Sequence, residues 1–371
     1  MIAIIHNIPI HYKHCLFQQL ARRGLSIFVI YSSRQMRNRG RLDLSDALYP
    51  YSVEYGGFWE QRPMIKEFWK VYQRLCQIEP DEVVIEGYDF QGAWAAWFWA
   101  KLRRKPIIMW FESNEHDYKR HAWKELVKQV FVRGCSAGHT YGSSSKRYLV
   151  KLGLSADRIS TGLAVVDVDL FARGCVSRLP VGADRVVLFV GRFVPAKNLL
   201  FLISAFSTYV RQQSLSRLRL FLIGEGPMEN VLRESVKKFG LEERVTFRGF
   251  ASQSELAGFY RASHFLVLPS TREVWGLVVN EAMASGLPVL VSEPCGCVPD
   301  LVNANTGWVF SPLEESALVR TLDLVDHLDA GCWQRMSIEA ARVAMRYGPA
   351  EVAERVLRSL SGEVCGSTGV S

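Results

Sequence analysis

Short apolar runs of strand type alternate with helix-length amphipathic segments along the whole chain. This alternation is typical of parallel sheets whose strands are joined by helical crossovers, so the chain is predicted to be an α/β protein. The strand-type runs are Ile2–Ile5, Leu25–Tyr31, Val83–Glu86, Pro106–Trp110, Gly138–Tyr141, Arg185–Val190, Leu218–Ile223, Val245–Arg248, His264–Leu268, Val289–Ser292 and Trp308–Phe310. The helices predicted in the first half are His14–Arg23, Met64–Ile78, Gln91–Leu102 and Trp123–Arg133.

Residues near 170–184 show neither the strand-type nor the helix-type pattern of apolar residues, which indicates a domain boundary. We therefore predict two Rossmann-like, doubly wound domains, residues 1–172 and 180–349, that face a central cleft. Pro349 should end one helix, and the segment 350–371 is expected to carry a last helix back onto the first domain.

Net charge and hydropathy limit the partners of the chain. The formal charge of +8 lies wholly in residues 1–175, and a positive half suits an anionic partner such as a lipid headgroup, a phosphorylated acceptor or nucleic acid. A solvated basic surface is the alternative, and no recognised nucleic-acid module is present. No apolar run approaches the roughly 20 residues that span a bilayer. The chain is expected to be cytoplasmic or peripheral to the inner face of a membrane, with reduced cysteines and no metal site.

Two carboxylates separated by seven residues are the strongest chemical signal. Glu273 and Glu281 lie on either side of Gly276, at a predicted strand-to-helix turn. If Gly276 opens the helix, both side chains can reach one ligand, and the first N–H groups of the helix suit a phosphate between them. Since sugar hydroxyls are good hydrogen-bond donors to carboxylates, the pattern indicates a sugar nucleotide.

The segments at the carboxyl ends of three upstream strands, which we call strand exits, carry further candidate ligand-binding residues. Each has a structural alternative. Gly191 is followed by Arg192 and Lys197, which can neutralise a diphosphate from two sides or remain ordinary loop cations. The segment Gly224-Glu225-Gly226-Pro227 leaves room for a nucleotide or forms a tight turn before a helix. The third exit, Arg248-Gly249-Phe250, places an aromatic ring for a base to pack on, or else a core or surface aromatic.

Together these segments resemble the retaining GT-B glycosyltransferases of family 4, the group 1 glycosyl transferases, over residues 185–312. The resemblance implies that Arg192 and Lys197 hold the donor diphosphate, that Glu281 binds the ribose, and that Glu273 orients the transferred sugar as a catalytic residue. Backbone N–H groups of the helix start would join the phosphate seat. The other donor-site residues that it implies are Gly191, Gly224, Glu225, Gly226, Arg248, Gly249, Phe250, Trp275, Gly276, Leu277 and Val278.

The activity implied is transfer of a hexose-type sugar from a nucleotide-diphosphate sugar to an acceptor hydroxyl, with retained anomeric configuration. In such enzymes the donor phosphate helps to remove the acceptor proton, so neither a metal nor another cofactor is expected. The acceptor would be a glycan, a lipid-linked or a small molecule in glycan, glycolipid or polysaccharide biosynthesis. A glycoside hydrolase also uses two carboxylates, but it would not require the Arg–Lys pair or the glycine-rich exits.

The first half departs from the family pattern at two strand ends. His6-Asn7-Ile8-Pro9 stands where many relatives carry Gly-Gly, and Glu112 lies where a histidine often faces the sugar. Glu112 is therefore a second catalytic candidate, with helix capping as its alternative. The candidates for acceptor or membrane contact are Asn7, Arg34, Arg37 and Arg39.

The tryptophan-rich segment Gln91–Lys105 is interpreted in two ways. It is either a crossover helix that packs on the sheet, which we favour, or an interfacial helix with its rings at headgroup level.

Two other functions stay open for the whole chain. One is a sugar-nucleotide epimerase or phosphorylase of the same fold, and the other is a catalytically idle peripheral membrane or scaffold protein.

Overall fold

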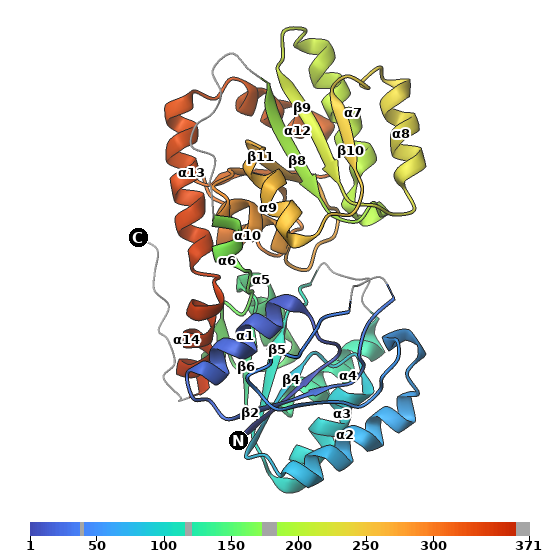
Figure 1. Ribbon diagram of the computed structural model, residues 1–371, viewed down its shortest axis with the longest axis vertical. Helices are drawn as coiled ribbons and strands as arrows, with labels where there is room; N and C mark the ends of the chain where they lie inside the picture. The colour runs from blue at the N-terminus through green and yellow to red at the C-terminus, as the bar shows by residue number, and fades with distance from the viewer. Residues whose placement is uncertain (38–40, 116–120, 173–183, 361–371) are drawn as a thin grey trace. The chain divides into compact units, whose positions relative to one another are not determined.

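The computed structural model describes residues 1–37, 41–115, 121–172 and 184–360. These residues form two compact units: residues 1–165 with the helix α14 (Pro349–Leu360), and residues 166–348 (Figure 1). The prediction that the last helix belongs with the first domain agrees with this division, because α14 packs against α1 (His11–Arg22). Residues 361–371 lie outside the described part of the chain.

The first unit is built on a seven-stranded parallel sheet with the order β3-β2-β1-β4-β5-β6-β7. The order reverses direction at β1, which is the arrangement of a doubly wound sheet. Its strands are β1 (Ile2–His6), β2 (Ile27–Tyr31), β3 (Tyr51–Val53), β4 (Glu82–Glu86), β5 (Ile107–Phe111), β6 (Ala137–Thr140) and β7 (Ile159–Thr161). Its helices, besides α1 and α14, are η1 (Trp59–Gln61), α2 (Met64–Ile78), α3 (Gln91–Arg103), α4 (Ala122–Arg133), α5 (Ser143–Leu152) and η2 (Ala156–Arg158).

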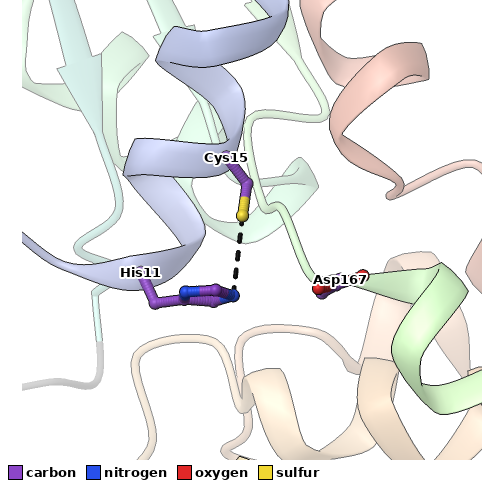
Figure 2. A group of neighbouring side chains, drawn as sticks. All are labelled: His11, Cys15 and Asp167. Carbon is purple, nitrogen blue, oxygen red and sulfur yellow. Dashed lines mark hydrogen bonds between the residues drawn. The ribbon is translucent and has the colours of Figure 1, made fainter. Parts of the chain in front are cut away.

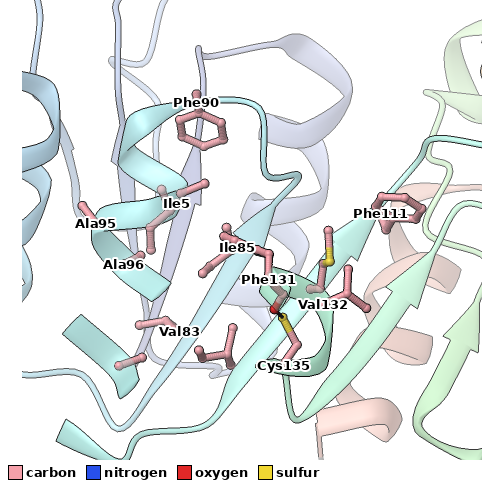
Figure 3. Close-up of a cluster of buried hydrophobic side chains, with 14 of the residues drawn as sticks. Ile5, Val83, Ile85, Phe90, Ala95, Ala96, Phe111, Phe131, Val132 and Cys135 are labelled. Carbon is pink, nitrogen blue, oxygen red and sulfur yellow. Dashed lines mark hydrogen bonds between the residues drawn. The ribbon is translucent and has the colours of Figure 1, made fainter. Parts of the chain in front are cut away.

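A core of apolar side chains fills the space between this sheet and helices α2 to α5 (Figure 3). Val83 and Ile85, two residues apart on β4, point to the same face, and Ala95 and Ala96 let α3 approach it closely. Burial of such side chains supplies the main driving force for folding, at about 25 cal/mol per Å² of apolar surface.

The tryptophan-rich segment is a crossover helix, as the favoured interpretation predicted. On α3, Trp99 is buried, and the indole N–H groups of Trp94 and Trp97 donate to the carbonyls of Tyr88 and Phe131, both at 3.0 Å. The tryptophans thus hold the helix to its neighbours. Two other apolar side chains of α3, Phe98 and Leu102, remain exposed.

The second unit has a six-stranded parallel sheet with the order β10-β9-β8-β11-β12-β13. Its strands are β8 (Arg185–Val190), β9 (Leu218–Ile223), β10 (Val245–Arg248), β11 (Phe265–Leu268), β12 (Val289–Ser292) and β13 (Gly307–Phe310). Its helices are α6 (Val168–Ala172), η3 (Pro195–Lys197), α7 (Leu199–Gln212), α8 (Glu229–Lys238), α9 (Gln253–Arg261), α10 (Leu277–Ala284), α11 (Val298–Leu301), α12 (Glu315–Asp326) and α13 (Ala330–Met345).

The predicted first domain, residues 1–172, extended too far. Helix α6 packs against α9, α10 and α13 of the second unit. The Ser285 hydroxyl donates to the Phe171 carbonyl at 3.0 Å, and the Val166 N–H donates to the Tyr347 carbonyl at the same distance. Residues 166–172 therefore belong to the second unit.

Among the described residues, none of the helices has the length and apolar character that crossing a membrane requires.

Candidate functional site

Three neighbouring strands of the second unit end beside one another at the carboxyl edge of the sheet. The Gly191 N–H after β8 donates to the Ile223 carbonyl at 3.0 Å, and the Gly224 N–H after β9 donates to the Arg248 carbonyl at 2.9 Å. These bonds join the predicted strand exits into one continuous surface. Ligands of open α/β sheets bind at this edge.

The two glycines of the exit after β9 are required by the protein's own backbone. Gly224 has a φ of +136°, and a Cβ placed there would lie 1.9 Å from the carbonyl oxygen of Gly191. A Cβ at Gly226 would lie 2.5 Å from the Phe193 carbonyl oxygen. Two loops cross here at backbone contact, so the structural alternative explains these glycines without a ligand. Glu225, between them, is exposed.

The predicted phosphate cation and the predicted sugar carboxylate form an ion pair. Lys197, the last residue of η3, bonds through Nζ to the carboxylate of Glu273, and each side chain is 18% exposed. The loop of Glu273 is tied to η3 by the Thr271 N–H, which donates to the Ala196 carbonyl at 3.0 Å. The structure thus holds a cation and a hydroxyl acceptor side by side, while Arg192 remains exposed.

Helix α10 begins as the sequence predicted, directly after Gly276. This glycine has a φ of +100°, a conformation that residues with a side chain rarely adopt. The indole N–H of Trp275 donates to the buried side chain of Asn280 at 2.8 Å, which fixes the loop to the first turn. The N–H groups of Leu277 and Val278 belong to this first turn, where helix geometry provides no intrahelical acceptor.

Glu281 lies one turn further along α10 and meets Tyr260 of α9. The Tyr260 hydroxyl donates to Oε2 of Glu281 at 2.8 Å. Burial raises the pKa of Glu281 to about 7, although the Tyr260 bond acts in the opposite direction. The carboxyl group can therefore gain or lose its proton near neutral pH. Sequence reasoning did not assign Tyr260, because its partnership with Glu281 exists only in the folded unit.

The exit of β10 lies farthest from the two carboxylates. Phe250 is 78% exposed, which excludes the core alternative, and Arg248 lies over the Phe259 ring at 5.9 Å. A Cβ at Gly249 would meet nothing within 4 Å. Three strand spacings separate β10 from β11, so Phe250 and the loop of Glu273 start about 14 Å apart.

The first unit has its own pocket at the carboxyl ends of β1, β4 and β5. The pocket has a volume of about 270 Å³, and Asn7 and Glu112 both line it. The structure thus brings together two candidates that the sequence assigned separately. Further charged lining residues are Glu86, Asp89 and Lys128. The lining thus offers carboxylate oxygens that can accept hydrogen bonds from a hydroxyl-rich ligand.

Glu86, at the end of β4, belongs to a buried charged triad that the sequence analysis missed. Its carboxylate contacts Nζ of Lys13 at 2.7 Å and pairs with Nε2 of His6. Lys13 is fully buried, and its ammonium lies 4.8 Å from the centre of the Trp110 ring. Burial by itself would raise the pKa of Glu86, but His6 and Lys13 outweigh it and hold that pKa at about 2. The carboxylate is therefore ionised at neutral pH, and it is a poor base.

The predicted arginine loop does not contribute its cations to this pocket. Arg34 donates to the Leu42 carbonyl at 3.1 Å, and neither Arg34 nor Arg37 lines the pocket, although Met36 between them does. Arg39 lies outside the described residues. The Arg34 guanidinium is thus bound to backbone outside the pocket.

His11 and Cys15 project from successive turns of α1 (Figure 2), with Sγ of Cys15 3.5 Å from Nε2 of His11. Residues four apart on a helix lie on one face, so the pair follows from its spacing. A structural zinc site needs four ligands, and two alone do not provide one. The expectation that no metal takes part stays a prediction.

Comparison with known proteins identifies the second unit. Residues 177–340 match the family model of glycosyl transferases group 1. This segment is therefore similar to the group 1 glycosyl transferases. The D-inositol 3-phosphate glycosyltransferase of Corynebacterium glutamicum is 30% identical over 272 residues, 66% of this chain and 63% of that protein. Across eight curated relatives, which include other glycosyltransferases and synthases, the match covers from 25% to 65% of the relative's length.

Solved structures extend the likeness to nearly the whole chain. The lipopolysaccharide outer core galactosyltransferase WaaB has a TM-score of 0.77 at 18% identity, and the match covers 98% of this chain and 99% of WaaB. An Anabaena protein in complex with UDP-glucose has a TM-score of 0.71 at 18% identity, with 98% of this chain and 100% of that one covered. These likenesses confirm the predicted GT-B fold.

The loop crossing yields a stability prediction. We expect Gly224→Ala to lower the free energy of unfolding by about 3 kcal/mol, because the new Cβ would collide with a backbone carbonyl. Gly249→Ala is the matched control, with an effect within about 0.5 kcal/mol. Urea denaturation of both variants measures the difference, and equal stabilities would show that the crossing is not the reason for the glycine.

The buried triad of His6, Lys13 and Glu86 yields a second stability prediction. Lys13→Met removes one partner of a buried pair, so it should lower the free energy of unfolding by about 3 kcal/mol at pH 7. The double variant Lys13→Met/Glu86→Gln should regain about half of that loss, since it no longer buries an uncompensated carboxylate. Chemical denaturation at pH 7 compares the two, and a double variant no more stable than the single one would refute the pairing.

Proposed function

We propose that the chain is a glycosyltransferase that moves a hexose-type sugar from a nucleotide-diphosphate sugar to an acceptor hydroxyl, with retention of anomeric configuration. The observation that carries the proposal is the arrangement around the start of α10. There Lys197 and Glu273 are paired beside the helix N-terminus, and Glu281 lies one turn inside the helix. This arrangement offers positive charge for a phosphate and a carboxylate on each side for hydroxyl groups.

In this proposal the donor lies across the strand exits of the second unit. Arg192 and Lys197 contact the diphosphate, together with N–H groups of the first turn of α10. Glu281 accepts hydrogen bonds from the ribose hydroxyls, and Phe250, at the far end of the surface, offers a ring for the base. The Anabaena relative solved with UDP-glucose supports a uridine nucleotide as the first donor to test.

The proposed chemistry is a front-side displacement in which a donor phosphate oxygen takes the acceptor proton. Arg192 and Lys197 then stabilise the negative charge that grows on the departing diphosphate, while Glu273 fixes the hydroxyls of the sugar. On binding, the diphosphate competes with Glu273 for Lys197, which releases the carboxylate toward the sugar. Both groups thus change partner in the same step.

We further propose that the pocket of the first unit binds the acceptor. Glu86 is permanently ionised, so it accepts a hydrogen bond from a hydroxyl without removing the proton. Glu112 and Asn7 also line the pocket and add polar groups to it. The pocket therefore favours a hydroxyl-rich acceptor over the anionic acceptor that the net charge suggested.

Replacement of the two donor-site carboxylates tests the proposal. Glu281→Ala should weaken nucleotide binding by about tenfold to a hundredfold, since it removes charged hydrogen bonds to the ribose. Glu273→Ala should lower turnover about a hundredfold while the protein stays folded. Thermal shift with nucleoside diphosphates and then sugar nucleotides identifies the donor, and product analysis follows transfer.

Two results would refute this assignment. Near wild-type turnover in both carboxylate variants would exclude the site, and conversion of the sugar nucleotide without any acceptor would indicate an epimerase. Absence of stabilisation by every nucleotide would favour the catalytically idle alternative.

Protonation of Glu281 gives a pH dependence. Its pKa is raised in the folded state, so ionisation destabilises the fold, and the free energy of unfolding should fall as the pH rises from about 4.5 through 7. Ribose hydroxyls favour the ionised form. Donor affinity should therefore rise about tenfold between pH 6 and pH 8, with release of a proton. Glu281→Gln should bind without this rise, and calorimetry of both proteins with the same sugar nucleotide cancels the ligand's own titration.

A further inference from the structure

Helix α4 turns an apolar stripe toward solvent. Trp123, Leu126, Val127 and Val130 follow the spacing i, i+3, i+4, i+7, which places them on one face. They are 65%, 62%, 45% and 61% exposed. Other side chains of the same helix, among them the fully buried Phe131, hold it to the core. The stripe is thus additional to the face that packs.

Exposed apolar side chains also lie on α3 and α2. The Trp97 ring of α3 stacks on Phe131 of α4 with 6.0 Å between ring centres, so these helices are neighbours. Phe98 of α3 is 50% exposed and meets Phe68 of α2 at 6.2 Å. Next to Phe68, Trp69 is 56% exposed. We call this the α2–α4 surface, defined by Trp69, Phe98, Leu102, Trp123, Leu126 and Val130.

The three helices of the surface are strongly basic. They carry eight Lys or Arg residues against two Glu, and both acids are engaged: Glu67 pairs with Arg62 and Glu125 with Lys128. Cations also lie over aromatic rings, Lys101 over Trp97 and Lys124 over Trp123, at 5.7 and 5.4 Å. The eight cations are Lys66, Lys70, Arg74, Lys101, Arg103, Lys124, Lys128 and Arg133.

We propose that the α2–α4 surface docks on the headgroup region of an anionic lipid bilayer. The exposed rings and aliphatic side chains would enter the interface while exposed cations such as Lys101 and Lys124 meet the lipid phosphates. Such an interface satisfies both halves of the surface. Nucleic acid would neutralise the cations but leave Leu126 and Val130 without an apolar partner.

Pairing with a second copy is disfavoured by charge. A two-fold contact places the same patch on both partners, so it would set this positive surface against itself. A bilayer supplies the opposite charge and an apolar layer together. The docking surface does not depend on the donor site of the second unit, so the two proposals can fail separately.

Sedimentation of the full chain with lipid vesicles tests the inference. We expect binding to vesicles of phosphatidylcholine mixed with phosphatidylglycerol, little binding to phosphatidylcholine alone, and weaker binding in high salt. Trp123→Ser/Leu126→Ser should weaken binding at least about tenfold. Lys101→Gln/Lys124→Gln should weaken it about fivefold per cation.

Matched controls lie on the second unit. Leu215 and Leu313 are 92% and 87% exposed, and Leu215→Ser/Leu313→Ser removes comparable apolar area elsewhere. Lys237→Gln/Lys238→Gln removes two exposed charges from α8. Both controls should bind vesicles like the unchanged protein, and an equal loss in the controls would overturn the proposal.

Two other outcomes would also overturn it. One is absence of vesicle binding at low salt by a protein that a nucleotide still stabilises. The other is a dimer in sedimentation velocity that Trp123→Ser/Leu126→Ser dissolves, because the surface would then join two copies. Vesicle binding without any nucleotide stabilisation would instead support this surface and count against the proposed donor site.

Discussion

Parallel strand pairing is the constraint on which both candidate sites depend, because it gathers the carboxyl ends of the strands at one edge of each sheet. In the second unit the exits of β8 and β9 come so close that a Cβ at Gly224 would overlap the Gly191 carbonyl. The same loop is pinned by the Phe193 N–H, which donates to Glu225 at 2.9 Å, and it leads directly into η3. The crossing therefore positions Lys197.

The sequence predicted the second unit better than the first for a physical reason. The observed bounds of β8, β9, β10 and β12 are those predicted, because each strand is an apolar run bounded by turn residues or charges. Strands β3 and β7 were not predicted. Each has three residues at an edge of the first sheet, and of these six side chains only that of Ile159 is buried, so neither strand shows a buried run. Pairing with a neighbour defines them.

The candidate sites divide in the same way. Glu273, Glu281 and Lys197 lie in local motifs whose glycines reveal the turns, so their chemistry can be predicted from spacing. The triad of the first unit, His6, Lys13 and Glu86, cannot be predicted from spacing. Lys13 looks like a solvated helix residue, and its partner Glu86 is seventy-three positions away. Only the pairing of β1 with β4, which aligns Ile5 with Ile85, brings the next residue of each strand, His6 and Glu86, together.

The two buried carboxylates show how environment sets a role. Glu86 is held by Lys13 and His6, so it stays ionised at neutral pH. Glu281 has a neutral partner, Tyr260, and burial dominates, so its charge depends on what else binds. The first is suited to holding a hydroxyl in place at neutral pH. The second is suited to a contact that forms when the ligand supplies the missing donors, because ligand binding and ionisation then favour each other.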